Sequence, residues 1–273
     1  MLKGFICPHI NGNLLFSECY SNPPCEKRCL PLPILITLGD GVRGVRQGVY
    51  STTEILNPPR VVVYQRRFDY YLDPQQMVWA SFGTSFHSMV EDAQEHLEVI
   101  GERENYTFES ENKFEVDIFG AKLTGIPDQY HVPSETITDY KTLKYYYDLY
   151  YIMEKKDWSQ SKYAWQVNIY RRFRFPNCKR QELVCLVKDF NRKLRSTKDV
   201  KPIETIEVPI FDDRLVDLEV ESRISSILSA EEDDDGIRDC TSDEIWNGIR
   251  CREYCPTNEH CSQYWQLKQG EWK

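Results

Sequence analysis

The sequence predicts a mixed fold of helices and strands, of the α/β (α+β) class, with a mixed central sheet flanked by helices. Strand-like segments and segments with helical spacing occur together along the chain. A hydrophobic content of 41% over 273 residues is enough for a sizeable core. Eight of the ten cysteines lie in two groups of four, so a cysteine-rich segment is expected at each end.

Composition divides the chain into three parts. Residues 1–45 form a short cysteine-rich segment, residues 46–230 hold the predicted sheet and helices, and residues 231–273 contain an acidic linker and the second cysteine group. No apolar run reaches the length of a bilayer span, and no signal-peptide pattern opens the chain. We therefore expect a soluble, cytoplasmic (intracellular) protein without a membrane partner.

The N-terminal segment carries four cysteines and a histidine within a short, proline-containing stretch. A secreted disulfide protein is disfavoured, because the secretion signal is missing and the middle of the chain has few cysteines. In a reducing cytosol four such thiolates would hold zinc, with His9 as a substitute ligand. Free structural thiols are the alternative. The four cysteines are Cys7, Cys19, Cys25 and Cys29.

Two helices are predicted in the first half of the central part. Residues 51–56 have the pattern of a capped helix start, which Pro58 and Pro59 end. A second helical run covers residues 88–97 and follows His87. One interpretation of His87 is a surface histidine that pairs with Glu91 on the same helix face.

Strand-like residues flank an acidic stretch in the middle of the chain. Residues 113–123 and 135–141 predict two extended arms, with a turn at residues 131–134. Alternate residues of a strand share a face, so Asp139 and Lys141 should point the same way. The tyrosine between them should point the other way.

If the two arms pair, Asp128 lies beside Asp139. Two adjacent carboxylates repel each other unless a cation lies between them. Their oxygen atoms are suitable ligands for Mg²⁺ or Mn²⁺, and Lys141 next to the metal could position a water. These groups are the ones that metal-assisted phosphodiester hydrolysis requires. A solvated hairpin is the alternative interpretation of this stretch.

The second half of the central part predicts a helix at residues 163–175, in which Gln166 and Tyr170 share one face. Strands are predicted at residues 182–190 and 203–210, and helical spacing returns at residues 213–228. Together with the arms described above, these segments complete the predicted mixed sheet and its flanking helices.

Four cysteines crowd the C-terminal tail with the spacing C-x10-C-x3-C-x5-C. So many thiolates in a short segment strongly indicate a metal centre. Both zinc and a [4Fe–4S] cluster use four cysteine ligands, so the spacing alone leaves the metal open. The four residues are Cys240, Cys251, Cys255 and Cys261.

The motif Pro127-Asp128 followed by Asp139-Tyr140-Lys141 resembles the PD-(D/E)xK nuclease superfamily. Two further features resemble its RecB-like exonuclease branch. One is the pattern Gly-Thr-x-x-His that ends at His87, and the other is the Gln-x-x-x-Tyr pair on the later helix. The likeness covers roughly residues 50–265 and leaves the N-terminal segment outside. It implies a restriction-endonuclease-like core.

The resemblance also implies roles for these residues. Lys141 would orient the attacking water and offset phosphate charge, while Gln166 and Tyr170 would position the nucleic-acid strand. Four groups would hold one or two Mg²⁺ or Mn²⁺ ions: His87, Asp128, Asp139 and the backbone carbonyl of Tyr140.

The tail resembles the iron–sulfur tail of CRISPR-associated RecB-like exonucleases and of AddB-type helicase-nucleases. In those proteins one cysteine precedes the nuclease core and three follow it. This chain has Asn57-Pro58-Pro59-Arg60 at the upstream position, so Cys240 would be the fourth ligand. The resemblance favours a [4Fe–4S] cluster, with zinc as the alternative.

The implied function is a divalent-metal-dependent DNA nuclease, an exonuclease that acts on DNA ends or single strands in recombination, repair, phage replication or CRISPR adaptation. The net charge is −9, but residues 162–180 carry six Lys or Arg and no acid, a basic stripe suited to DNA. Residues 207–244 carry fourteen acids and three bases, and could face a recombination, replication or CRISPR adaptation protein.

Two other functions fit parts of the sequence. A catalytically silent, metal-stapled module that binds DNA or protein would account for the cysteine groups and the split charge. A redox sensor built on the tail would need only its four cysteines. An intact set of two carboxylates and a lysine favours the nuclease.

Overall fold

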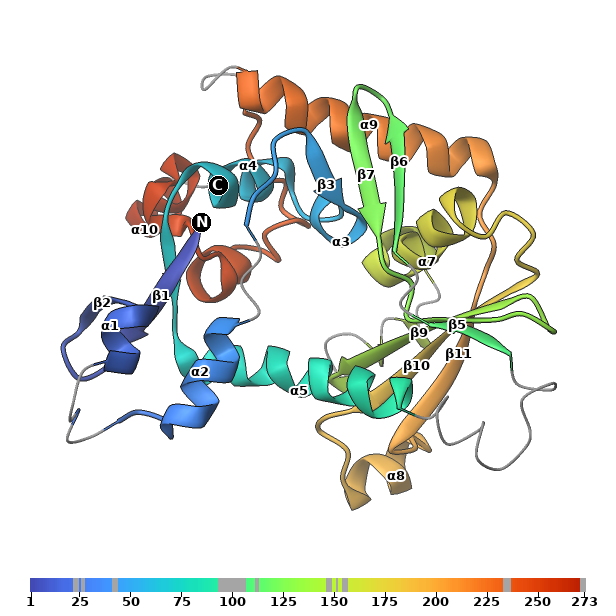
Figure 1. The fold of residues 1–273 in the computed structure, drawn as a ribbon, viewed down its shortest axis with the longest axis horizontal. Coiled ribbons are helices and arrows are strands. Elements are labelled where there is room, and N and C mark those ends of the chain that lie inside the picture. Colours follow the sequence, from blue (N-terminus) through green and yellow to red (C-terminus); the bar gives the residue numbers. More distant parts are fainter. Residues whose placement is uncertain are drawn as a thin grey trace. The chain divides into compact units, whose positions relative to one another are not determined.

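Contacts divide the chain into two compact units, each built from helices and strands, so the fold is of the predicted mixed α/β kind (Figure 1). Unit 1 comprises Met1–Gly48, Asn57–Ser81 and Ser222–Lys273, and unit 2 comprises Val49–Leu56 and Phe82–Glu221. Both cysteine-rich segments belong to unit 1, and the three-part division by composition stays a prediction. The computed structural model describes residues 1–21, 25, 28–40, 44–92, 107–110, 113–145, 149–150, 152–153, 157–232 and 237–270.

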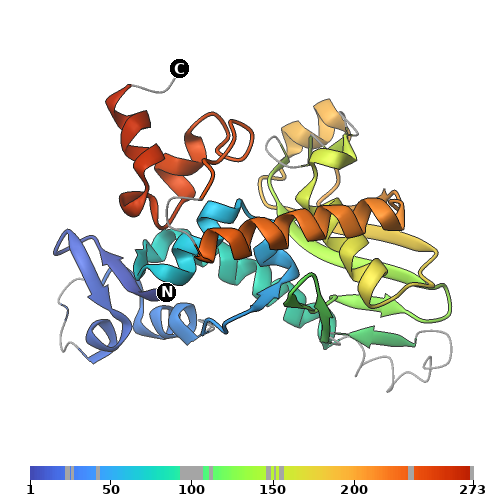
Figure 2. The ribbon, with the colours of Figure 1, turned by 90° about the horizontal axis from the view of Figure 1, so that it is seen from above.

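Unit 1 contains a three-stranded sheet in which β1 is antiparallel to β2 and parallel to β4 (dark blue for β1 and β2 in Figure 2). Phe5, Leu35 and Leu38 form a buried core beside this sheet. The strands are β2 (Gly12–Leu15), β1 (Leu2–Cys7) and β4 (Tyr70–Leu72). The helices are α1 (Phe16–Ser21), α2 (Leu32–Asp40), α4 (Pro59–Arg67), residues 74–81 of α5 (Pro74–Glu91) and residues 222–232 of α9 (Asp213–Glu232).

The cysteine tail has its own small core within unit 1. Val61 of α4 packs with Cys240, Ile245 and Cys251. The side-chain amide of Gln263 accepts a 3.0 Å hydrogen bond from the Cys240 N–H and donates a 2.7 Å bond to the Cys240 carbonyl. These two hydrogen bonds join Cys240, near the start of the tail, to Gln263, near its end. Its helical elements are η4 (Arg250–Tyr254), η5 (Asn258–His260) and α10 (Ser262–Gln269).

Unit 2 holds two sheets. The five-stranded sheet has the order β11-β10-β9-β8-β5, in which β9 is parallel to β10 and antiparallel to β8. Its strands are β5 (Phe108–Ser110), β8 (Gln129–His131), β9 (Thr136–Leu143), β10 (Arg180–Val187) and β11 (Ile203–Val208). The three-stranded sheet consists of β3 (Val49–Ser51), β7 (Ala121–Gly125) and β6 (Phe114–Ile118).

The pairing of the predicted arms differs from the expectation. Residues 113–123 do not form one arm; they form the hairpin β6–β7, which turns at Phe119 and Gly120, both with positive φ. This hairpin pairs with β3 rather than with β9. The antiparallel partner of β9 is the short β8, which directly follows Asp128. The bend before β8, rather than a longer paired arm, therefore brings Asp128 next to β9.

The predicted helices are present, with adjusted bounds. Ser51 caps α3 (Thr52–Ile55) through a capping box with Glu54. The helix predicted at residues 163–175 is α7 (Lys162–Phe173), which follows η3 (Trp158–Gln160), and a short α8 (Arg192–Lys198) precedes β11. The helix that carries His87 begins at Pro74, earlier than expected. Residues 93–97 of its predicted run lie outside the described part.

Helix α9 buries Val216, Val220, Ile224 and Ile227, which recur at helical spacing. Leu215 and Leu218 lie in the same predicted helical stretch but are exposed. The acidic run that follows α9 lies outside the described residues from 233 to 236. No helix in the described residues is long and apolar enough to cross a membrane.

Candidate functional site

Asp139 lies on β9, between β8 and β10 in the five-stranded sheet. Its side chain is fully buried, and its Oδ2 is 2.5 Å from Lys141 Nζ, as expected for two residues on one face. Apart from this ion pair, neither carboxylate oxygen has a hydrogen-bonding partner among the described residues. Burial raises the pKa of Asp139 to about 7, while the Lys141 charge opposes this shift and Asp128 adds to it. A buried carboxylate whose described contacts are limited to one ion pair is suited to a further cation.

Asp128 lies in the bend between β7 and β8 and faces β9. Its Oδ2 accepts a 2.7 Å hydrogen bond from the Tyr140 backbone N–H. Its charge also acts on Asp139, so the two carboxylates share one region, as the sequence suggested. The backbone bond fixes the bend against the strand, and it holds Asp128 next to the Asp139–Lys141 pair.

His87 extends from α5 to the same end of β9. Its Nε2 is 2.8 Å from the Tyr140 carbonyl oxygen, and its Nδ1 is 3.3 Å from Asp128 Oδ1. Both partners are acceptors, and the hydrogen bond to Asp128 raises the pKa of His87, although burial opposes this. The side chain of Glu91, the partner in the surface interpretation, lies outside the described part.

The arrangement can be compared with the needs of Mg²⁺ or Mn²⁺. Adjacent ligands of an octahedral ion with bonds of about 2.1 Å lie about 3 Å apart, and His87 Nε2 and the Tyr140 oxygen are 2.8 Å apart. The Asp139 oxygens, of which Oδ2 now pairs with Lys141, would supply further ligands. Within the residues described, no three His, Cys, Asp or Glu side chains already converge on one point. The donor set fits, provided that His87 and Lys141 exchange their present partners.

Gln166 and Tyr170 lie on α7, one helical turn apart, and both are buried. Gln166 Nε2 donates a 2.8 Å hydrogen bond to the Tyr170 hydroxyl. Burial raises the pKa of Tyr170, and the charges of Asp139 and Asp128 raise it further, so its ring lies near both carboxylates. The structure therefore brings all the sequence-predicted residues of this site into one region of unit 2.

Five of the six basic residues in the stripe at 162–180 are already paired with acids. Arg172 forms two 2.9 Å bonds to Asp217, and Arg171 pairs with Asp213, both on α9. The remaining pairs are Arg174 with Glu109, Lys179 with Glu135 and Arg180 with Glu207. An anionic strand that binds here would have to compete with these carboxylates.

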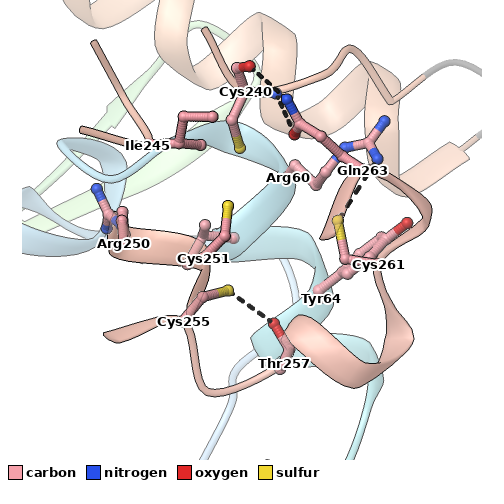
Figure 3. Close-up of a pocket in the computed structure, with 11 residues that line it drawn as sticks. Arg60, Tyr64, Cys240, Ile245, Arg250, Cys251, Cys255, Thr257, Cys261 and Gln263 are labelled. Atoms are coloured by element: carbon pink, nitrogen blue, oxygen red, sulfur yellow. Dashed lines mark hydrogen bonds between the residues drawn. The ribbon is translucent and has the colours of Figure 1, made fainter. Parts of the chain in front are cut away.

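The four tail cysteines line one pocket of unit 1, with an empty volume of about 320 Å³ that is partly open to solvent. Figure 3 shows their sulfur atoms directed towards the same space. Cys240 lies before η4, Cys251 lies on η4, Cys255 directly follows it, and Cys261 directly precedes α10. Burial raises the pKa of Cys240 to about 12 and that of Cys251 to about 11, and neighbouring thiolates add to both shifts. Mutual repulsion of this kind is relieved when a metal ion binds.

Two arginines line the same pocket, and the sequence analysis did not identify them as functional. Arg60 Nη1 donates to Cys261 Sγ at 3.7 Å, and Arg250 Nη2 donates to Asn57 Oδ1 at 2.7 Å. The available signal was the stretch at residues 57–60, which holds a conspicuous Asn-Pro-Pro-Arg sequence. Arg60 reaches the cysteine pocket through contacts between distant segments, which the spacing of the cysteines does not encode.

The N-terminal cysteines also lie near one another. Burial raises the pKa of Cys19, and Cys29, Cys7 and Cys25 raise it further. Cys19 and Cys29 pack against the core of Phe5, Leu35 and Leu38. The four thiols are within range of one another's charge, but among the described residues no three of them converge on one point, and zinc binding by them stays a prediction.

Comparison with solved structures gives a likeness of fold. The crystal structure of the protein SSO0001 aligns with a TM-score of 0.53 and 16% identity, over 85% of this chain and 94% of that one. A phage-related exonuclease from Haemophilus somnus 129PT aligns with a TM-score of 0.33 and 13% identity, over 52% of this chain and 67% of that one. No family model and no curated protein matches the sequence.

Proposed function

We propose that this protein is a divalent-metal-dependent DNA nuclease with a restriction-endonuclease-like core, and that it acts on DNA ends or single strands. The observation that carries the proposal is the buried Asp139 carboxylate, which among the described residues receives no hydrogen bond beyond its ion pair with Lys141 and lies within range of the Asp128 charge. Burying such a group costs folding free energy, and an apolar residue at this position of the strand would avoid that cost. A bound cation would remove that cost.

Four groups would hold Mg²⁺ or Mn²⁺: Asp128, Asp139, His87 Nε2 and the Tyr140 carbonyl. When bound, the ion supplies Lewis-acid stabilisation of negative charge on the phosphate and favours ionisation of water. The metal would also compete with the proton that the Asp128 contact stabilises on His87.

Lys141 would act as a hydrogen-bond donor rather than a base. Burial lowers its pKa, but the charges of Asp139 and Asp128 raise it by more, so the ammonium persists. It can orient the attacking water and interact with a phosphate oxygen. Tyr170 stays a neutral phenol because burial, together with the charges of Asp139 and Asp128, raises its pKa. Its hydroxyl accepts from Gln166 and can donate to the strand.

The tail pocket would hold a structural metal centre in the same protein. Four thiols that face one space, with two guanidinium groups beside them, fit a [4Fe–4S] cluster or zinc. The resemblance of the tail favours the cluster. Loss of this centre should lower the stability of the tail rather than stop the chemistry of the Asp139 site directly.

The decisive experiment uses the purified protein, Mg²⁺ or Mn²⁺, and end-labelled linear DNA beside circular DNA and RNA. Wild type should cleave DNA only with metal, and Asp139→Asn and Lys141→Ala should each lower the rate at least about a hundredfold. Asp117→Asn is the matched control, because Asp117 is an exposed carboxylate on β6 of the same unit. It should keep wild-type activity.

The outcomes separate the proposal from the silent binding module. Full activity in either site variant would refute the proposal. Calorimetry with Mn²⁺ adds a second readout, since a nuclease site must bind the ion and lose it in Asp128→Ala. Absent cleavage with no Mn²⁺ site would favour the module, and cleavage of circular DNA would replace the exonuclease by an endonuclease.

A further inference from the structure

Arg60 is a buried cation that points at a cysteine sulfur. The residue is only 8% exposed, and its Nη1 donates to Cys261 Sγ at 3.7 Å and lies 3.4 Å from Ser262 Oγ. Residues 60 and 261 are far apart in sequence, so this contact is a product of the fold. Figure 3 shows the Arg60 guanidinium beside Cys261 at the edge of the cysteine pocket.

The rest of the guanidinium is fixed by the chain just before the first tail cysteine. Nη2 donates a 2.6 Å hydrogen bond to the Ile237 carbonyl, and Nε donates a 3.1 Å bond to the Arg238 carbonyl. Asp239 adds an ion pair of 2.8 Å from the solvent side. These bonds leave Nη1 facing the pocket, so the geometry of the Cys261 contact is set by backbone groups.

Charge balance gives this arrangement a purpose. Four cysteine thiolates around Zn²⁺ or an oxidised [4Fe–4S] core carry a net charge of about −2. A charge buried without compensation is costly. Arg60 and Arg250 both line the pocket and together offset such a centre.

We infer that Arg60 is a positioning and charge-compensating residue of the tail metal centre, and that it donates an N–H···S hydrogen bond to the Cys261 thiolate. The inference rests on the proposed tail metal centre. Arg60 stabilises the metal-loaded thiolates without ligating the metal itself.

The test compares metal retention in the full-length protein purified anaerobically. Arg60→Gln keeps an N–H donor but removes the charge, and Arg60→Lys keeps the charge but removes the fork that holds the carbonyls. The matched control is Arg66→Gln on the same helix, because Arg66 donates to the Arg46 carbonyl and lies away from the pocket. Elemental analysis and the visible spectrum identify the metal in each protein.

Release of the metal to a chelator is then followed in time, and for an iron–sulfur centre the reduction potential is also measured. Arg60→Gln should release the metal at least about tenfold faster than wild type, as for other residues that hydrogen-bond to metal ligands. Its cluster should be harder to reduce, because a compensating cation is gone. Arg60→Lys should recover most of the potential, and Arg66→Gln should match wild type in both measurements.

The two levels of failure are distinguishable. Wild type without any tail metal would overturn the metal centre, and this inference with it. A loaded wild type whose Arg60→Gln variant keeps wild-type retention and potential would overturn only the role of Arg60. If Arg60→Gln does not fold, Arg60→Lys carries the test. Because lysine keeps the positive charge, its cluster should stay close to the wild-type reduction potential. A large drop in potential in Arg60→Lys would overturn charge compensation.

Discussion

The Tyr140 backbone N–H donates a 2.7 Å hydrogen bond to Asp128 Oδ2, and this bond joins the two halves of the candidate active site. We predict that Asp128→Asn keeps the bond, since an amide oxygen also accepts, but loses Mn²⁺ binding and cleavage. Asp128→Ala should lose the hydrogen bond as well as Mn²⁺ binding and cleavage. Loss of that bond should lower the free energy of unfolding by about 1–2 kcal/mol. Thermal unfolding beside Mn²⁺ calorimetry checks this. Equal stability of the two variants would contradict the structural part of the prediction.

Gly125 precedes the acidic bend and leaves no space for a side chain. A Cβ atom at this position would be 2.3 Å from Phe114 Cε1 and 2.8 Å from Tyr170 Cε1. We expect Gly125→Ala to lower the free energy of unfolding by about 1–3 kcal/mol and to slow cleavage, because the Tyr170 ring must shift. Gly44→Ala, where a Cβ meets nothing within 4 Å, is the control. Denaturant unfolding gives the comparison, and equal effects of both changes would argue against the predicted crowding.

Glu244 gives the cysteine tail a pH dependence. It bonds Arg238 at 2.7 Å through both oxygens and accepts from the Thr241 N–H. Burial raises the pKa of Glu244, but Arg238 and the Thr241 N–H lower it by more, to below the usual 4.5. A depressed folded pKa means stability that is present above the unfolded pKa and lost as the pH falls through the folded value.

Glu244→Gln should therefore be less stable than wild type at pH 7, and the difference should shrink steadily as the pH falls below about 4.5. Thermal unfolding of both proteins between pH 3 and 7 measures it. A difference that stays constant over this range would show that the carboxylate charge is not the source of the stability.

The N-terminal thiols make a separate prediction. Cys19→Ser or Cys29→Ser should abolish zinc binding by this segment and destabilise it, because both residues also pack on the Phe5 core. Cys178→Ser is a suitable control, since Cys178 belongs to neither group and bonds the Arg180 carbonyl. Elemental analysis together with denatured-state thiol counting gives the result. Unchanged zinc content in the Cys19 and Cys29 variants would leave them as free structural thiols.

The ion pair of Arg172 and Asp217 tests whether the basic stripe binds DNA. Asp217→Asn removes the competing carboxylate, so DNA affinity should rise about two- to fivefold, in line with the usual energy of exposed pairs. The salt dependence should steepen by about one phosphate contact. Fluorescence titration at several salt concentrations, with Asp117→Asn as control, measures both. An unchanged affinity would remove Arg172 from the proposed DNA surface.

The local geometry of the candidate site could be predicted from the sequence. Strand alternation places Asp139 and Lys141 on one face, and the ion pair between them confirms it. Helical spacing places Gln166 within hydrogen-bonding distance of Tyr170, as found. Both relationships depend on backbone repeats of two to four residues, which sequence patterns record directly.

Relationships between distant segments could not be predicted in the same way. The choice of β3 rather than β9 as partner of the β6–β7 hairpin depends on packing that no local pattern contains. The pairing of Arg171 and Arg172 with acids of α9 likewise needs the tertiary fold. For this reason the stripe seemed free in the sequence and is neutralised in the structure.

The Gln263 amide, which grips both backbone groups of Cys240, has a consequence for the order of maturation. The loop that carries the four sulfurs is closed by hydrogen bonds within the chain. The entropic cost of closing it is therefore offset without a contribution from metal binding. We therefore expect newly made chains to shape an empty receptacle first and to be charged with metal afterwards. Delivery, rather than folding, would then limit how quickly the finished protein accumulates.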